Sequence, residues 1–354
     1  MVNRIVPWNT DEPASVGLDK AQLDDAWAEL ATHATKAFLV ARRGQLIYER
    51  YGDGWAADKR HYTASMAKAL VGGLSLALLM DDGLVAPDDL AGKYVPQWLD
   101  DPRKSKITLR DLATHTSGIE DAELSAADRT QALAEGRTLT DHHMELPGWK
   151  GIFWRATNPE HTIDGEPDPF SISRDLAPVI FAPGTQAHYS NPGIAMLSYC
   201  LTVALQKSSA SDIITLLRQR IFEPLGLQEN EDYSIGYGRT WDVDGLPMVA
   251  NWGGGSFTPR ATARVGQMLA QNGAWESRQL IAPNVLHTTL TGAQKPPDLA
   301  ARAAADPSPA TGLGWWSNAD GYWQDIPNDA VLGAGAGDQI LLVIPSLDLV
   351  AVRN

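Results

Sequence analysis

The segment from Ser65 to Met80 constrains the fold more than any other part of the chain. Its residues are small and apolar almost throughout, and Asp81-Asp82-Gly83 follows, so the pattern predicts a buried helix that ends at a glycine. Apolar residues make up 44% of the 354 residues, which is enough for a sizeable core around such a helix. Its most apolar part, Ala69 to Met80, is too short to span a bilayer and is broken by Gly72-Gly73. We therefore expect a core helix.

Strand patterns lie near both ends of the chain, and helical patterns lie between them. The expected strands are 37–41, 46–48, 339–344 and 349–352. The expected helices after the core helix are 193–205 and 210–220. Residues 119–180 are polar with little periodicity, so we expect a long loop region, which in a compact protein is commonly a lid or binding wall. This order predicts an α/β layer built from the two termini, with a mostly helical domain inserted between them.

Charge and cysteine content narrow the classes of partner. The formal net charge of −14 argues against nucleic-acid and anionic-membrane partners, because phosphate binding needs a surplus of Lys and Arg. A single cysteine, Cys200, excludes an internal disulfide. The first residues, Met1 to Pro7, contain no apolar stretch of signal-peptide length, so we expect a cytoplasmic protein. The oligomeric state stays open.

Ser65-Met66-Ala67-Lys68 opens the predicted core helix and is the one Ser-x-x-Lys in the chain. A spacing of three places both side chains on one helical face, with Ser65 beside free backbone N–H groups and the positive end of the helix dipole. A serine attacks well only when a base takes its proton. Lys68 can be that base if burial lowers its pKa from about 10.4 to about 7, at a cost of about 4–5 kcal/mol. The alternative is an N-capping serine beside a surface lysine, and this motif alone leaves both open.

Tyr189-Ser190-Asn191 is a second candidate group, at the junction of a loop with the predicted helix 193–205. A tyrosine there can reach into a cleft and relay a proton beside a lysine. Asn191 can hold that lysine or bind a substrate carbonyl, whereas a turn tyrosine with a capping asparagine is the structural alternative. The chain has no nucleotide-binding glycine loop and no His-Glu-x-x-His, so we expect neither a cofactor nor a metal ion.

With both motifs in this order, the chain resembles the serine hydrolases of the class C β-lactamase and penicillin-binding-protein superfamily, including family VIII-type esterases and related amide hydrolases. Segments that match as well are 79–84, 107–118, 181–185 and 223–227. The resemblance implies an antiparallel sheet flanked by helices, formed by residues 1–80 and 250–354, with residues 81–249 as an inserted helical and loop domain. It also implies that His115 belongs to a structural segment and is not catalytic.

The third motif of this family lies on the strand beside the nucleophile and reads Lys-Thr-Gly, His-x-Gly or Trp-Gly-Gly. The matching position is Gly333-Ala334-Gly335, and a register shifted by two, Gly335-Ala336-Gly337, is the alternative. The resemblance implies an oxyanion hole made by the N–H groups of Ser65 and Ala336. In β-lactamases and DD-peptidases a cation at this motif helps to bind the substrate carboxylate. This chain lacks that cation, which puts both activities in doubt. The family normally adds a further strand and a helix after the strand that ends here at Asn354, so we expect a shortened chain or another cover for that face.

The combined motifs predict an enzyme that forms an acyl-enzyme on Ser65 and hydrolyses small neutral carboxylic esters. Lys68 and Tyr189 share the proton transfers, and Asn191 orients Lys68 or the substrate. The alternatives are hydrolysis of short linear amides or D-amino-acid peptides, weak β-lactamase activity, acyl transfer, and a non-catalytic binding protein that keeps the fold. Five tryptophans either line an apolar acyl pocket or are structural: Trp149, Trp154, Trp315, Trp316 and Trp323.

Overall fold

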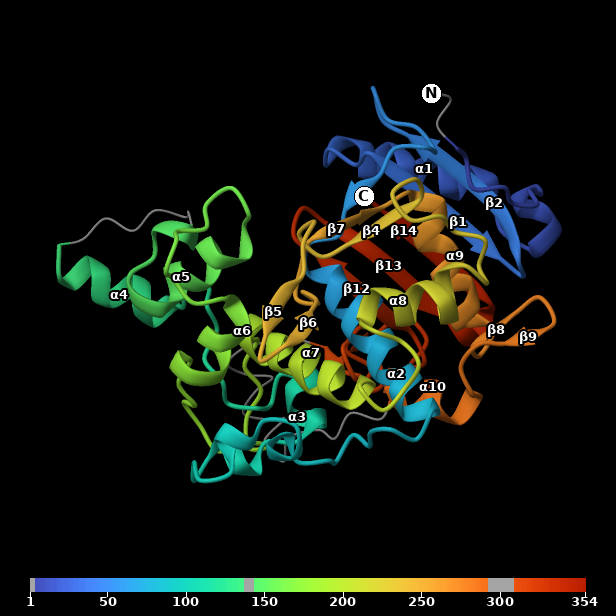
Figure 1. Cartoon of the computed structure of the whole chain (residues 1–354). Coiled ribbons are helices and arrows are strands. Elements are labelled where there is room, and N and C mark those ends of the chain that lie inside the picture. Colours follow the sequence, from blue (N-terminus) through green and yellow to red (C-terminus); the bar gives the residue numbers. More distant parts are fainter. Residues whose placement is uncertain (1–3, 137–142, 292–308) are drawn as a thin grey trace.

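The computed structural model describes residues 4–136, 143–291 and 309–354. Its main layer is a seven-stranded antiparallel sheet in the order β10-β11-β12-β13-β14-β1-β2. The strands are β1 (Ala37–Arg42), β2 (Gln45–Tyr51), β10 (Ala310–Thr311), β11 (Trp316–Ser317), β12 (Val331–Gly335), β13 (Gln339–Ile344) and β14 (Leu349–Arg353). Strands from the two ends of the chain meet where β14 pairs with β1, with Arg353 opposite Phe38 (Figure 1). The predicted fold class, an antiparallel sheet formed by both termini, is confirmed.

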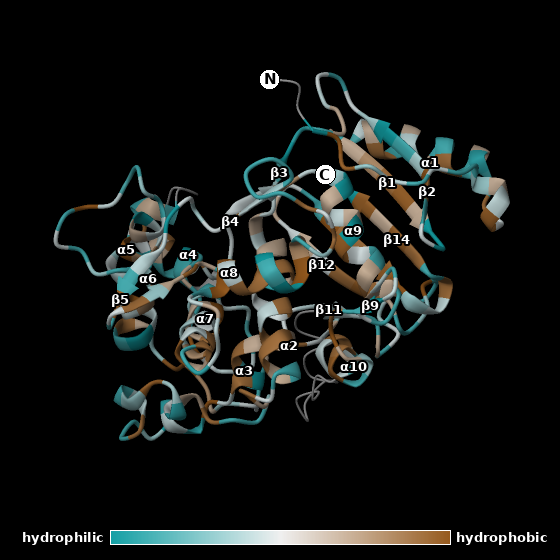
Figure 2. Cartoon of the chain, turned by 45° about the vertical axis from the view of Figure 1, so that its right-hand side comes forward, coloured by the Kyte–Doolittle hydropathy of each residue, from teal (hydrophilic) through white to brown (hydrophobic). Residues whose placement is uncertain are grey.

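Each face of this sheet is covered by a helix. Helix α9 (Pro259–Ala270) packs on β1, β13 and β14 so closely that a Cβ at Gly266 would lie 2.6 Å from Val350. Helix α1 (Lys20–Thr32) belongs to the opposite face, where Val40 and Ile47 are buried. Successive strand residues point to opposite faces, so each strand contributes to both layers. Figure 2 shows the apolar strands enclosed between these helices.

The predicted core helix runs without a break from Ala64 to Asp81. It begins with a 3-10 turn (Ala64–Met66), continues as a π-helical turn (Lys68–Gly73) and ends as α2 (Leu74–Asp81). These 18 residues are long and apolar enough to cross a membrane, but 78% of them are buried inside the protein. The stretch is longer than the expected apolar part, and it contacts α7 (Asn191–Leu205), α8 (Ile213–Leu217) and α10 (Pro283–Thr291).

The middle of the chain forms a mostly helical lobe beside the sheet (Figure 1). Its further elements are α3 (Leu109–Ala113), α4 (Ala126–Ala134), α5 (Gly148–Thr157), α6 (Pro169–Ser171), β5 (Trp241–Val243) and β6 (Leu246–Met248). Residues 119–180 are therefore not the continuous loop that their weak periodicity indicated. The helices there are short and start at capping side chains, such as Ser125, whose hydroxyl accepts the N–H of Asp128. The predicted division at residues 81–249 remains a prediction.

A small three-stranded sheet lies at the start of the core helix. Strand β4 (Tyr233–Ile235) pairs with β7 (Gly255–Phe257), which pairs with β3 (His61–Tyr62) directly before the core helix. A separate hairpin consists of β8 (Ala274–Trp275) and β9 (Arg278–Gln279). The first of these sheets holds the start of the core helix beside β12, because Thr63 donates its N–H to the carbonyl of Gly255.

Candidate active site

A pocket of about 310 Å³ lies where the core helix begins, between the helical lobe and strand β12. The core helix contributes Ser65, Lys68 and Ala69 to its walls, and the lobe contributes His115, Glu123 and Tyr189. The sheet side contributes Trp315, Trp316, Leu332, Ala334, Gly335 and Ala336. Both motifs that the sequence singled out therefore face one cavity, although they lie more than a hundred residues apart in the chain.

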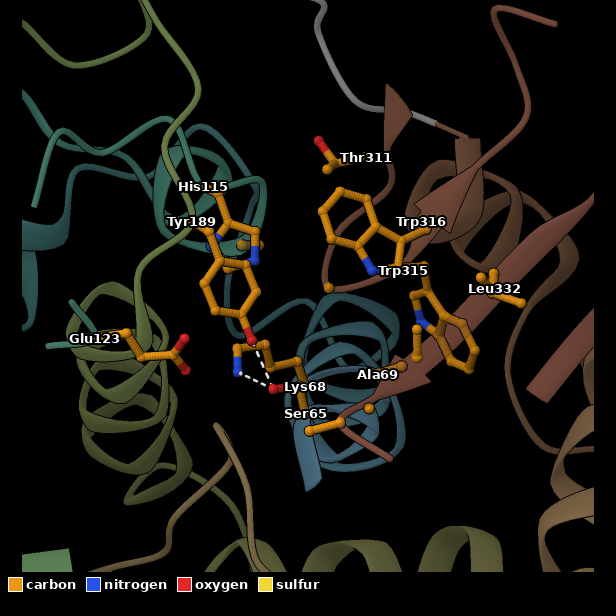
Figure 3. Close-up of a pocket in the computed structure, with 15 residues that line it drawn as sticks. Ser65, Lys68, Ala69, His115, Glu123, Tyr189, Thr311, Trp315, Trp316 and Leu332 are labelled. Carbon is orange, nitrogen blue, oxygen red and sulfur yellow. Dashed lines mark hydrogen bonds between the residues drawn. The ribbon is translucent and has the colours of Figure 1, made fainter. Parts of the chain in front are cut away.

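Ser65 sits at the sharp turn that leads into the core helix. Ala64 just before it has a φ of +45°, in the left-handed region that non-glycine residues rarely adopt, and such backbone strain is common at functional sites. The Ser65 Oγ lies 2.6 Å from the hydroxyl oxygen of Tyr189 and 3.1 Å from the Lys68 Nζ (Figure 3). One hydroxyl thus contacts two groups that can exchange a proton with it.

Lys68 is buried, with 5% of its surface exposed. Its Nζ donates to the Oδ1 of Asn191 and to the backbone carbonyl of Trp252, both at 2.7 Å. Burial lowers the pKa of Lys68 to about 7, because the charged form loses its hydration, while the negative charges of Asp121 and Glu123 oppose this effect. Lys68 is therefore buried enough, and its pKa low enough, to act as the base that Ser65 needs.

These contacts determine how neutral Lys68 is oriented. The carbonyl oxygens of Asn191 and Trp252 can only accept hydrogen bonds, so they take the two hydrogens of the neutral amine. The remaining lone pair then points to the third neighbour, the Ser65 Oγ. The geometry therefore directs the proton-accepting position of Lys68 to the hydroxyl that needs a base.

Tyr189 completes the contact with Ser65 and stays protonated. Burial raises the pKa of its hydroxyl above the ordinary value. Its ring lies 4.6 Å from the Lys68 Nζ and 4.6 Å from the ring of His115. His115 also accepts the N–H of Ser190 at its Nδ1, 3.2 Å away. His115 thus lines the pocket and supports the loop that carries Tyr189, which is compatible with the structural role expected for it.

Asn191 begins α7 and is 1% exposed. Its Oδ1 faces Lys68, while its Nδ2 donates to Asp121 at 3.0 Å and to Glu123 at 3.1 Å. Sequence reasoning missed both carboxylates. The sequence feature that could have indicated them is the presence of three acidic residues within 120–123, shortly after the matched segment 107–118.

Gly333-Ala334-Gly335, the position predicted for the third motif, lies on β12. Leu332, Ala334 and Ala336 line the pocket, whereas a Cβ at Gly335 would lie 2.2 Å from the carbonyl oxygen of Thr63. Position 335 therefore requires a glycine for close approach to the start of the core helix. Gly335 belongs to both registers, so this requirement does not distinguish them. Gly333-Ala334-Gly335 lies wholly on β12, whereas Gly337 lies beyond its end. Ser65 and Ala336 line the same pocket, as the oxyanion hole implied by the family requires.

Two of the five tryptophans line this pocket, Trp315 and Trp316. Trp149 lines a separate pocket beside Lys150, and Trp154 donates its Nε1–H to the carbonyl of Ala122. Trp323 packs edge-on against Tyr322 and is not among the residues that line the pocket. In the described ranges, no group of three or more His, Cys, Asp or Glu is placed to hold a metal ion. The expectation of a site without metal or cofactor stays a prediction.

An antiparallel sheet beside a helix that carries a Ser–Lys pair, met by a tyrosine from a second motif, defines the class of β-lactamase-like serine hydrolases. The chain belongs to the Beta-lactamase family, whose model matches residues 24–353. It is 24% identical over 306 residues to the 6-aminohexanoate-dimer hydrolase of Paenarthrobacter ureafaciens. The aligned region covers 83% of this chain and 67% of that relative.

Solved structures show the same fold. A penicillin-binding protein homologue from Caulobacter crescentus has a TM-score of 0.66 at 16% identity. The superposition covers 99% of this chain and 93% of the homologue. EstCE1, a hydrolase with promiscuous acyltransferase activity, has a TM-score of 0.64 at 15% identity. That superposition covers 97% of this chain and 93% of EstCE1. At these identities the similarity concerns the fold, and the substrate has to be argued from the pocket.

Proposed function

We propose that this protein hydrolyses small neutral carboxylic esters through an acyl-enzyme on Ser65. The observation that carries the proposal is the simultaneous contact of the Ser65 Oγ with Tyr189 at 2.6 Å and with Lys68 at 3.1 Å in a pocket. A nucleophile, a base with a pKa of about 7 and a protonated relay are the groups that acyl transfer requires.

In the acylation step, Lys68 accepts the proton of Ser65 while the Ser65 Oγ bonds to the substrate carbonyl carbon. The N–H groups of Ser65 and Ala336 stabilise the resulting oxyanion, and each such donor contributes about 3–4 kcal/mol to lowering the barrier. When the bond to the leaving oxygen breaks, Tyr189 donates its proton to that oxygen and takes one from Lys68. The alcohol leaves with the Tyr189 proton, and the proton that Ser65 lost replaces it on Tyr189.

In the second step, water replaces the alcohol. Lys68, neutral again after acylation, takes a proton from the water as the water oxygen bonds to the acyl carbon. The bond to Ser65 then breaks, and Ser65 regains its proton as the carboxylic acid leaves. The proton count is restored after each turnover, so neither a metal nor a redox partner takes part in the proposed cycle.

The preference for uncharged substrates rests on the charges of the pocket. Among the described residues that line it, Lys68 is the one Lys or Arg, and its hydrogen bonds commit it to Ser65, Asn191 and Trp252. Glu123 adds a carboxylate to the wall (Figure 3). An acyl group that carries a carboxylate would meet like charge there and no free cation. A neutral acyl group instead meets the apolar side chains of Trp315, Trp316 and Leu332.

Hydrolysis of linear amides is the second candidate. Its specific support is the similarity to the 6-aminohexanoate-dimer hydrolase, whose name describes an amide substrate. An amine leaves only when it is protonated, and the raised pKa of Tyr189 keeps a proton available beside Ser65. The same residues would therefore serve, with a greater demand on Tyr189.

A substrate panel on one enzyme sample tests the proposal. p-Nitrophenyl butyrate, the matched butyryl p-nitroanilide and nitrocefin report ester, amide and β-lactam hydrolysis, and the S65A variant supplies the blank for each. We expect the highest kcat/KM for the ester and no turnover of any substrate by S65A. A higher kcat/KM for the anilide would favour the amide candidate, and turnover of the ester by S65A at the wild-type rate would refute both.

A further inference from the structure

A buried carboxylate behind the catalytic group holds Asn191 at two points. Asp121 lies in the loop between α3 and α4 and is 8% exposed. Its Oδ1 accepts the backbone N–H of Asn191 at 2.8 Å and the side-chain Nδ2 of Asn191 at 3.0 Å. The same oxygen accepts the N–H of Ala122 at 2.8 Å. One carboxylate oxygen thus fixes both the start of α7 and its first side chain.

These bonds decide which end of the Asn191 amide faces Lys68. With Nδ2 between Asp121 and Glu123, the Oδ1 must point the other way, to the Lys68 Nζ at 2.7 Å. A flipped amide would oppose its N–H groups to those of Lys68 and its oxygen to two carboxylates. The acidic pair therefore selects the orientation in which Asn191 accepts a hydrogen bond from Lys68.

We propose that Asp121 is a positioning residue of the acyl-enzyme reaction: it locks Asn191 with its amide oxygen toward Lys68, and it adds a negative charge behind the base. This inference rests on the proposed function of Ser65 and Lys68. Asp121 does not line the pocket, so its hydrogen bonds act through Asn191, while its charge acts on Lys68 directly.

The charge of Asp121 also affects the base. Three titratable groups interact with the charge of Asp121: Lys68 on the core helix, Glu123 on the same loop and Tyr189 before α7. Tyr237 interacts with Glu123 and Tyr189 instead. Burial raises the pKa of Asp121, and Glu123 raises it further. The charged forms of both carboxylates favour protonated Lys68. Removing one of these charges should therefore lower the pKa of Lys68.

Two variants separate the charge of Asp121 from its hydrogen bonds. Because all three bonds above use Oδ1, Asp121→Asn can keep them through its amide oxygen and loses only the charge. Asp121→Ala loses both. For D121N we expect the acid limb of kcat/KM to move to lower pH by about 0.5 unit or more. For D121A we expect kcat to fall about 10- to 100-fold with little change in KM, since buried donors lose their partner. Asp88→Asn, on an exposed side chain, is the matched charge control.

A double-mutant cycle tests whether Asp121 acts through Asn191. If its hydrogen bonds act through Asn191, the D121A/N191A variant will lose no more kcat than N191A alone at about pH 8 or above, where Lys68 is neutral with or without the charge of Asp121. Losses that multiply would show two independent effects and overturn the proposal. If D121A does not fold, as judged by its melting temperature, D121N decides: an acid limb unchanged from wild type overturns the proposal. Failure of the proposed function would instead appear as an inactive wild-type enzyme or an active S65A variant.

Discussion

The pocket has two walls of opposite character. On the side of the core helix and α7, hydrogen bonds link Ser65, Lys68, Tyr189, Asn191 and Asp121 in one network. On the sheet side, the lining consists mainly of Trp315, Trp316, Leu332, Ala334 and Ala336 (Figure 3). Within the described part of the chain, their side chains form no hydrogen bond with that network. The difference separates two tasks: the polar wall determines the reaction, and the apolar wall determines which acyl groups fit.

This division predicts different kinetic effects on the two sides. A change in the polar wall removes interactions that stabilise the transition state, so it lowers kcat. A change in the apolar wall alters contact with the bound substrate, so it changes KM or the preference among substrates. Five predictions test this difference, in order of decreasing effect.

Removal of the base should have the largest effect. Lys68→Met keeps most of the apolar length of the side chain but cannot accept the Ser65 proton. We expect kcat/KM for a neutral p-nitrophenyl ester to fall about 10²- to 10⁴-fold. Lys93→Met, at an exposed lysine paired with Asp89, is the control and should keep wild-type activity. A K68M enzyme with wild-type kcat would show that Ser65 is activated in another way.

The relay should be the next most important group. Tyr189→Phe removes the hydroxyl that lies 2.6 Å from Ser65 and keeps the ring that packs on His115. We expect kcat to fall about 10²-fold for esters, and more for anilides because the leaving amine must be protonated. Stopped assays measure kcat for both substrates. Tyr322→Phe, at an exposed tyrosine, is the control. Equal, small losses for both substrates would assign the proton relay to Lys68 alone.

The pH profile follows from the low pKa of Lys68, about 7. Lys68 is protonated below that pH and cannot accept a proton, and it is neutral above it. We therefore expect kcat/KM to rise with pH, about tenfold per unit on the acid side, and to level off above about pH 7. Initial rates between pH 5 and 9 measure the limb. A profile without a step between pH 6 and 8 would contradict a lysine base.

On the apolar wall, Trp316→Ala should enlarge the pocket without touching the network. The lost contact area should raise KM for a butyryl ester about 10-fold, with kcat changed far less. Trp323→Ala, at a tryptophan outside the pocket lining, is the matched control. If W316A lowered kcat as strongly as Y189F does, the proposed division between the two walls would be wrong.

The smallest effect is expected from adding the cation that the third motif lacks. Ala334→Lys places an ammonium group on the half-buried pocket wall of β12. The ratio of kcat/KM for a carboxylate-bearing ester to that for a neutral ester should rise about two- to fivefold, and less at high salt. A ratio that does not change, in a variant that folds, would place the substrate acyl group away from Ala334.

The parts of this site that could be predicted from the sequence are those with a local pattern. The core helix is a long apolar stretch that ends at a glycine, the strands at both termini are short apolar runs, and Ser65 and Lys68 are three residues apart. The contacts of Asp121 with Asn191 and of Trp252 with Lys68 cross 70 and 184 residues of chain. The Trp252 contact uses a backbone carbonyl, which carries no sequence signal. The short helices between residues 119 and 180 were not predicted, because each has too few turns to show a helical period in the sequence.

Covalent labelling tests the central claim most directly. The wild-type protein and the S65A variant are incubated with a fluorophosphonate probe, digested and analysed by mass spectrometry. We predict one adduct on the peptide that contains Ser65 in the wild-type protein, and none in S65A. An adduct on another residue, or labelling of S65A at the wild-type rate, would contradict the assignment of Ser65 as the nucleophile.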